Sequence, residues 1–498
     1  MTKNPIFSNR LIIIFATGLV NLLCYFQIGQ MGDLRQHMPV FFLRHFILAG
    51  AFLFLVFYLR KTEFSLAAGQ ANKSENNSQC LLILILSYSI IYRILVLFDY
   101  PFLTDDIFRY IWDGRVWGAG INPFLYAPND PALFPVHDTV IYPHVNHPHI
   151  PTIYAPVLQI LFRITAGISA SILAFKILVT IFDLAVITIF LHFLARWKFP
   201  QIWILIYAWN PLVIIETSGS GHIDGIGVFF LLLSLLLFEK KKEIFSSIVL
   251  GLAILVKFIP LIIFPFTLLA KSRRQQLTMT ATLAAILLLG YAPFLDAGTA
   301  LFKAMFIYAE KWRFNDSIFF IIYEISDFII PESLVKTYIQ FKNLTVNAET
   351  LLTFRQDLIL LISKGVLGVF FLYLIVSLYR WLQKSGEITS RKLMKVWFVL
   401  FGSLCLITPT LHPWYLLWIL PITIFHREKA WLVLSLTIVW SYEIVARYAT
   451  TGIWQESGWI KLAVFTPFYA LLLYEIWQHR VTIVAILKAG IPARACKN

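Results

Sequence analysis

Long apolar runs separated by short polar segments dominate the pattern of this chain. Single apolar windows lie near residues 11–30, 41–59, 80–99, 171–195, 201–219, 223–238, 277–294, 356–380, 396–411, 430–446 and 459–478. A membrane-spanning helix needs about 20 consecutive, mostly apolar residues, so these windows predict spans. The pattern therefore indicates an all-α, polytopic membrane protein.

Two segments are apolar but interrupted by polar residues. Residues 244–270 have two short apolar arms around Lys257, and residues 396–425 have a long and a short arm around His412. Each segment is expected to form two helices that meet at a polar vertex. Non-helical backbone at membrane depth survives only where protein or a wet cavity covers it, so both vertices are expected to line one chamber. With both pairs counted, we expect about 12–14 spans.

Composition and charge agree with this class. Hydrophobic residues make up 59% of the chain and charged residues 14%, and the mean hydropathy is +0.75. The net charge of +14 does not require a nucleic-acid partner, because Lys and Arg cluster between the apolar runs. The positive-inside rule places such clusters in the cytoplasm. We therefore expect a multi-pass protein of the inner (plasma) membrane, with both termini cytoplasmic and its polar loops outside.

The most polar stretch beside a predicted span is residues 104–115, which hold three carboxylates and two guanidiniums. Charges at the hydrocarbon boundary are costly unless paired or solvated, which predicts a polar chamber there. A carboxylate can accept the proton of an attacking hydroxyl while nearby cations stabilise a departing anion. The alternative is that these residues only form ion pairs along a helix on the membrane surface.

Five segments resemble, in order, the bacterial integral-membrane mannosyltransferase-like family of the GT-C superfamily. They are TDDIFRYIWDGRVWGAGINPF, NHPHIPTIYAP, SGHIDG, LVKFIPLIIFP and LHPWYLLWILP. The resemblance implies an enzyme that uses a polyprenyl-phosphate sugar. It also implies a GT-C-like core over residues 80–300, with a catalytic external loop at 100–153. Residues 1–79 would add two N-terminal spans, 301–355 an external loop and 356–498 the C-terminal spans.

The same resemblance assigns roles to individual residues. Asp105 or Asp106, the acidic pair, would be the general base, and Asp105 is preferred. Both are expected at the start of a helix, where the helix dipole favours the ionised form. Arg109 would hold the second carboxylate or a donor phosphate, or else form a structural ion pair with the acidic pair. Lys257 and His412 would contact the donor phosphate. Their alternatives are a lysine that snorkels to the interface and a plain helix break. The other residues expected around the substrate are Arg115, Trp112, Asn122, His222, Asp224, Tyr154 and Tyr415.

No metal ligands are assigned, because the turn around His222 and Asp224 offers too few ligands and the histidines of the loop are irregularly spaced. A divalent metal is nevertheless compatible with the chemistry. The sequence thus predicts inverting transfer of a hexose, expected to be mannose, to a glycan or lipid acceptor on the outer face. The alternative is a transporter or flippase of lipid-linked glycan, which shares broken helices and buried charges but should show inverted repeats.

Overall fold

The computed structural model describes residues 5–67, 75–101, 103–269, 271–426 and 429–490, and the regular elements of these residues are helices. The first half contains α1 (Pro5–Gly29), α2 (Met38–Ala67), α3 (Glu75–Leu97), α4 (Asp106–Gly118), α5 (Pro156–Ile168), α6 (Ile172–Arg196), α7 (Leu205–Ala208), α8 (Pro211–Ile214), α9 (Asp224–Glu239), α10 (Glu243–Ile254), α11 (Phe264–Leu268) and α12 (Arg273–Tyr291).

The second half contains α13 (Lys303–Lys311), α14 (Ile318–Ile329), α15 (Glu332–Phe341), α16 (Ala348–Lys384), α17 (Ser390–Ile407), α18 (Leu420–His426), α19 (Lys429–Thr437), α20 (Glu443–Thr451) and α21 (Gly458–Gly490). Short helices of other types are η1 (Leu34–Gln36), η2 (Pro131–Val136), η3 (Tyr142–His144), η4 (Gln201–Ile204), η5 (Ile215–Gly219), η6 (Ile259–Ile263), η7 (Ala292–Phe302), η8 (Pro413–Trp418) and η9 (Ile438–Tyr442). Among these, η5 is a π-helix. The all-α prediction is confirmed.

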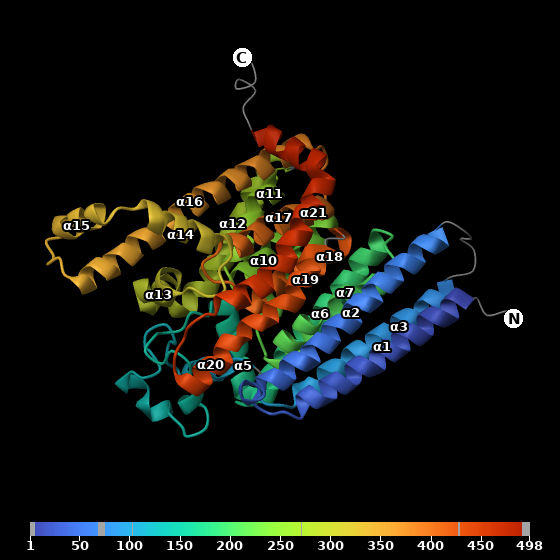
Figure 1. The fold of residues 1–498 in the computed structure, drawn as a ribbon, viewed down its shortest axis with the longest axis horizontal. Coiled ribbons are helices and arrows are strands. Elements are labelled where there is room, and N and C mark those ends of the chain that lie inside the picture. Colours follow the sequence, from blue (N-terminus) through green and yellow to red (C-terminus); the bar gives the residue numbers. More distant parts are fainter. Residues whose placement is uncertain (1–4, 68–74, 102, 270, 427–428, 491–498) are drawn as a thin grey trace, which may run out of the picture.

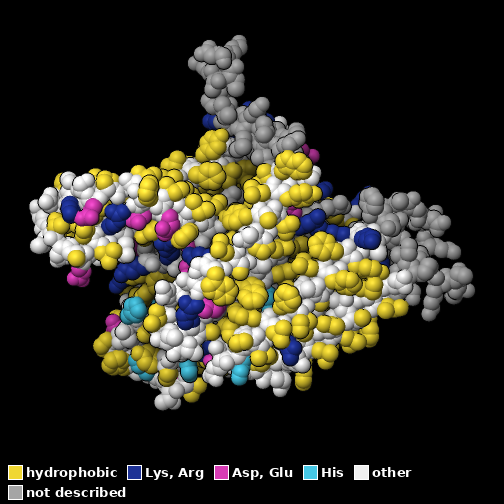
Figure 2. Space-filling view, viewed as in Figure 1, with side chains coloured by type: hydrophobic (Ala, Val, Ile, Leu, Met, Phe, Trp, Pro, Cys, Tyr) yellow, Lys and Arg dark blue, Asp and Glu magenta, His cyan; other side chains and the backbone are white. Residues whose placement is uncertain are grey.

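The helices form one elongated bundle in which α1, α2 and α3 lie side by side at one edge (Figure 1). Large apolar side chains remain exposed on the outer faces of the long helices, including Leu288 on α12, Val369 on α16 and Leu462 on α21. Figure 2 shows hydrophobic side chains spread over much of the visible surface. Such a surface is stable in hydrocarbon rather than in water, so these faces are expected to contact lipid.

Eight helices among the described residues are long and apolar enough to cross a membrane, or nine if the bent pair Gln201–Ala208 and Pro211–Gly219 is one span. This count is below the predicted 12–14. Several predicted spans are short helices in the structure, such as α9 with 16 residues and α10 with 12. The predicted span at 201–219 is bent by 58° where Pro211 begins a new helix.

Both predicted vertices are present. In the first, α10 ends at Ile254 and η6 begins at Ile259, which leaves Lys257 between two short helical arms. In the second, α17 ends at Ile407 and η8 begins at Pro413, which leaves His412 as the residue before the second arm. Proline at or next to the start of each second arm fits these breaks, because the first helical positions need no backbone N–H.

The expected external loop at 301–355 is largely helical. It contains α13, α14, α15 and the first turns of α16, and α14, α15 and this end of α16 project from the bundle (Figure 1). A small core of Ile330, Val335, Ile339 and Ile359 holds the projection together. The sequence pattern missed these helices because their apolar stripes are short and do not resemble spans.

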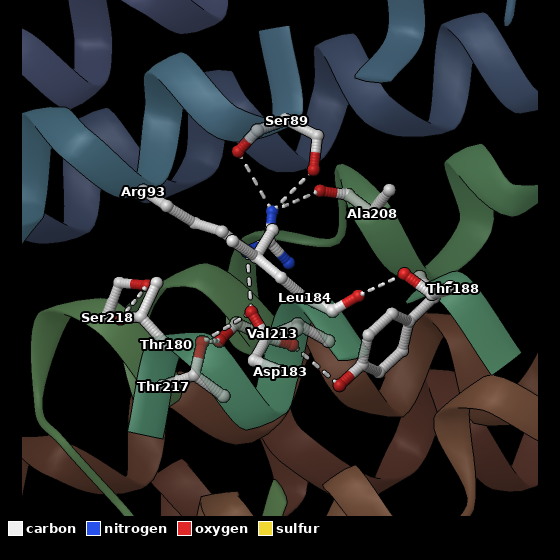
Figure 3. A network of polar contacts seen from close by, with 11 residues as sticks. Ser89, Arg93, Thr180, Asp183, Leu184, Thr188, Ala208, Val213, Thr217 and Ser218 are labelled. Atoms are coloured by element: carbon white, nitrogen blue, oxygen red, sulfur yellow. Dashed lines mark hydrogen bonds and ion pairs between the residues drawn. The ribbon is translucent and has the colours of Figure 1, made fainter. Parts of the chain in front are cut away.

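A buried polar network joins α3 to α6 (Figure 3). Arg93 Nε donates to Asp183 at 2.5 Å, and both side chains are almost fully buried. Asp183 also accepts hydrogen bonds from the hydroxyls of Tyr207 and Thr217, at 2.7 and 3.1 Å. A buried ion pair gains from additional hydrogen bonds to its charged groups, and here the hydrogen bonds to Asp183 connect α3, α6 and η5. The network therefore fixes the position of η5 within the bundle.

Candidate active site

The acidic pair lies at the start of α4, as predicted. Asp105 is the residue before the helix and Asp106 is its first residue. The backbone N–H of Asp106 donates to Thr104 Oγ1 at 3.1 Å. The positive end of the helix dipole favours ionised carboxylates at this position.

Close packing of α4 on α5 sets where the acidic pair lies. A Cβ atom on Gly114 would stand 2.4 Å from the carbonyl oxygen of Phe162, so only glycine allows this approach. The apolar face of α4, including Ile107 and Ile111, is buried in a core shared with α5 and α6. The first part of the expected external loop is therefore a helix packed on the bundle rather than a free loop.

Asp105 pairs with an arginine from the N-terminal region. Arg35 lies in η1 and its Nη1 donates to Asp105 Oδ1 at 2.8 Å, while its Nε and Nη2 bind Asp33 at 2.8 Å each. Burial and the neighbouring Asp106 carboxylate raise the pKa of Asp105, whereas Arg35 opposes this shift. The sequence interpretation missed Arg35, because it treated residues 1–79 as two additional spans without a part in the site.

Asp106 faces a different set of groups. Its Oδ1 accepts from Asn146 Nδ2 at 2.7 Å, and its Oδ2 lies 3.9 Å from His222 Nε2. His222 is only 1% exposed and reaches this position from the turn between η5 and α9. Gly221 has φ +82° in that turn, a conformation that glycine adopts readily and most other residues avoid. The SGHIDG motif thus presents His222 to the acidic pair.

The His412 vertex joins the same group of residues. Trp414 is stacked between His222 and His412, with ring centroids 3.8 and 4.3 Å apart respectively. Burial lowers the pKa of His412 to about 3, and the nearby positive charge of Lys257 adds to this shift. The imidazole of His412 is therefore neutral at ordinary pH.

The Lys257 vertex completes the group. Lys257 Nζ donates to Asp224 Oδ1 at 2.8 Å and lies 3.8 Å from the centre of the Tyr415 ring. Asp224 also accepts from Trp418 Nε1 at 2.6 Å. Lys257 therefore contacts both Asp224 and Tyr415, and Tyr415 packs edge-on against His412. We call Asp106, His222, Asp224, Lys257, His412, Trp414 and Tyr415 the polar cluster.

Arg109 does not contact the acidic pair, so the prediction of an ion pair there is wrong. Its Nε donates to Asp113 Oδ1 at 2.9 Å and its Nη2 donates to the carbonyl of Ile150 at 3.0 Å. Asp113 also accepts from Thr152 and Gln159. Asp105 and Asp113 are each four residues from Arg109, so helix spacing alone did not distinguish the two pairings. Arg109 thus ties α4 to the chain before α5.

The other predicted residues lie in α4 and in the chain from α4 to α5, which together we call the layer, and they contact structural neighbours. Arg115 pairs with Asp138, and Trp112 packs edge-on against His137 at 5.4 Å. Asn122 Nδ2 donates to Asp296 at 2.5 Å, which ties the layer to η7. Tyr154 packs edge-on against Tyr110 at 4.9 Å. These contacts hold the layer in place.

Further residues of the site were not predicted. Glu216 Oε2 lies 2.8 Å from His222 Nδ1, and Tyr442 donates to both Glu216 oxygens at 2.8 and 3.0 Å. An acidic residue inside an apolar window is a sequence signal for such a role. Across the described residues, no group of three or more His, Cys, Asp or Glu side chains is arranged to hold a metal ion.

Comparison with known proteins identifies the class. A model of the alpha-(1->6)-mannopyranosyltransferase N-terminal domain matches residues 25–273, and a model of glycosyltransferase family 87 matches residues 152–409. Each match covers half of the chain or slightly more, so the protein is a membrane glycosyltransferase. The chain belongs to the mannosyltransferases and the family 87 glycosyltransferases that these two models describe. This match confirms the family resemblance predicted from the sequence. Neither the curated proteins nor the solved structures gave a match.

Proposed function

We propose that this enzyme transfers mannose from a polyprenyl phosphate to a glycan or lipid acceptor. One observation carries the proposal. The five sequence segments that resemble the family converge in the structure on the acidic pair and the polar cluster, and three of these segments span breaks between helices. The family matches support a mannosyltransferase and a glycosyltransferase over the transporter alternative.

The proposed reaction is a direct displacement with inversion. The acceptor oxygen forms a bond to the anomeric carbon while the bond from that carbon to the phosphate oxygen breaks. The electron pair of the broken bond leaves with polyprenyl phosphate, and the acceptor proton passes to a carboxylate of the acidic pair. A base within hydrogen-bond reach of the attacking hydroxyl contributes typically about 10²- to 10⁴-fold in rate.

The contacts favour Asp106 over Asp105 as the base, although the sequence favoured Asp105. Asp105 is held by Arg35, and its carboxylate would have to leave that ion pair to accept a proton. Asp106 instead faces His222 and the polar cluster. Arg35 would then keep Asp105 ionised beside the site.

Lys257 and His412 are the proposed contacts of the donor phosphate. Lys257 uses one donor on Asp224, and its ammonium group has three, so it can also donate to an anion. A neutral His412 can donate one ring N–H. Both side chains pack on Tyr415, and this shared neighbour supports a common contact with one phosphate. With the basic clusters in the cytoplasm, the site would face the outer side of the membrane.

The test of the proposed function is transfer from defined donors. Purified enzyme is incubated with radiolabelled polyprenyl-phosphate mannose or glucose and with a membrane extract as acceptor. We expect mannose transfer by the wild-type enzyme and its loss, by at least about 100-fold, in Asp105→Asn with Asp106→Asn, because an amide cannot accept the proton. Asp130→Asn in the same layer is the matched control and should keep wild-type activity.

The single variants separate the two carboxylates. Asp106→Asn should lose more turnover than Asp105→Asn. Wild-type turnover in the double variant would remove both residues from catalysis, and absence of transfer from every polyprenyl-phosphate sugar would overturn the donor class.

A further inference from the structure

Behind Asp106 lies a second buried carboxylate, Glu216, which has no part in the displacement described above. Glu216 is fully buried on η5, and His222 stands between it and Asp106. The three side chains form a line in which Nδ1 of His222 faces Glu216 and Nε2 faces Asp106. The distances are 2.8 Å to Glu216 and 3.9 Å to Asp106.

The ring of His222 is held in this orientation from several sides. Its backbone N–H donates to the carbonyl of Glu216 at 2.8 Å, and the ring is stacked on Trp414. Glu216 is in turn fixed by the hydroxyl of Tyr442. The next residue of η5, Thr217, donates a hydrogen bond to Asp183 of the Arg93 network (Figure 3).

Neither ring nitrogen of His222 has a hydrogen-bond partner among the described residues, although the side chain is 1% exposed. A buried polar atom without a hydrogen bond costs about 1–3 kcal/mol, so such an atom calls for an explanation. The cost is offset if each nitrogen forms a hydrogen bond to the carboxylate that it faces, Nδ1 to Glu216 and Nε2 to Asp106. Contacts of this kind are often long without substrate and tighten in the reacting complex.

We propose that His222 and Glu216 form a proton relay behind Asp106, with Glu216 as its positioning residue. The inference rests on the proposed transferase function. The proton that Asp106 takes from the acceptor hydroxyl moves to Nε2 of His222, which returns Asp106 to its carboxylate form. The resulting imidazolium is stabilised by Glu216, and the proton leaves through solvent after the products depart.

This arrangement repeats a known physical logic. A carboxylate beside Nδ1 selects the imidazole tautomer whose Nε2 is free to accept a proton, and it stabilises the imidazolium that forms. The π-helical form of η5 also favours a functional role for Glu216, because π-helical turns occur frequently at functional sites. Tyr442 donates a hydrogen bond that keeps Glu216 in place, so its effect on the relay is indirect.

The relay is tested by turnover and KM for polyprenyl-phosphate mannose in Glu216→Gln, Glu216→Asp and His222→Gln. Glu216→Gln retains an acceptor for Tyr442 but removes the charge, so turnover should fall about 10- to 100-fold with KM unchanged. Glu216→Asp should recover part of the loss. Ser441→Ala, next to Tyr442 and also buried, is the matched control and should behave as wild type.

A double variant shows whether Glu216 acts through His222. Adding Glu216→Gln to His222→Gln should cause no further loss, because the partner is already gone. Additive losses, an effect on KM alone, or wild-type turnover in Glu216→Gln would each overturn the relay. If Glu216→Gln does not fold, the same cycle is measured with Tyr442→Phe, for which a several-fold loss is expected. An inactive wild-type enzyme would instead contradict the proposed function.

Discussion

At the scale of single residues, the site is built from charges that are paired before any substrate arrives. Lys257 is neutralised by Asp224, and Asp105 by Arg35. Each pair still has unused hydrogen-bond donors or lone pairs, so it can bind a ligand. Because the charges are already paired, no unpaired charge stands at the membrane face before the ligand binds. Trp414 stacks on both His222 and His412. It therefore holds the histidine next to the proposed base at a fixed distance from the histidine proposed to contact the phosphate.

The donor-phosphate assignment predicts coupled effects of Lys257 and His412. Lys257→Met and His412→Ala should each lower turnover of polyprenyl-phosphate mannose about 10-fold or more, because negative charge grows on the leaving phosphate as its bond breaks. Measured as a double-mutant cycle, the losses should be non-additive, since both residues would touch one anion. Lys364→Met, in α16, is the control.

The same variants also bear on pH dependence. Because burial lowers the pKa of His412 to about 3, its imidazole stays neutral from pH 5 to 8, and His412→Ala should not alter the shape of the pH profile in that window. A change of shape there, or strictly additive losses with Lys257→Met, would contradict shared contact with one phosphate.

At the scale of elements, breaks in helices bring the site together. Two apolar segments stop at Lys257 and His412, and a third bends before η5. Their polar residues meet in the polar cluster, which reaches the start of α4 through His222 and Asp106. The Arg93 and Asp183 network anchors this arrangement from within the bundle (Figure 3). It connects α3 to η5, and through η5 to Glu216 and His222.

Removal of one member of that network should destabilise the enzyme. Arg93→Leu leaves Asp183 buried without its cation, which costs about 3–5 kcal/mol, while Asp183→Leu with Arg93→Leu should recover much of the loss. Thermal unfolding of the purified protein in detergent is the measurement. Arg60→Leu, within α2, is the comparison and should have a much smaller effect. Equal melting temperatures for Arg93→Leu and wild type would show that the network does not support the fold.

At the scale of the whole molecule, the proposed site requires an outward-facing layer. If the basic clusters lie in the cytoplasm, a cysteine at Asp130 should react with an impermeant thiol reagent in intact cells, whereas one at Lys241 should react only after the membrane is opened. The exposed native Cys80 is replaced by serine beforehand. The reverse labelling pattern would place the acidic pair in the cytoplasm and contradict the outward-facing site.

Hydrophobic patterning and local motifs by themselves determined the class of this protein, the start of α4 at the acidic pair and the two polar vertices. These features depend on short-range rules: the apolar length of a span, the dipole at a helix start and the effect of proline on a helix. The tertiary structure decided the rest. It paired Arg35 with Asp105 and Glu216 with His222, and it turned Arg109 to Asp113. The first of these contacts joins residues 70 positions apart, and such pairings depend on how helices pack, which hydropathy and spacing along one chain do not specify.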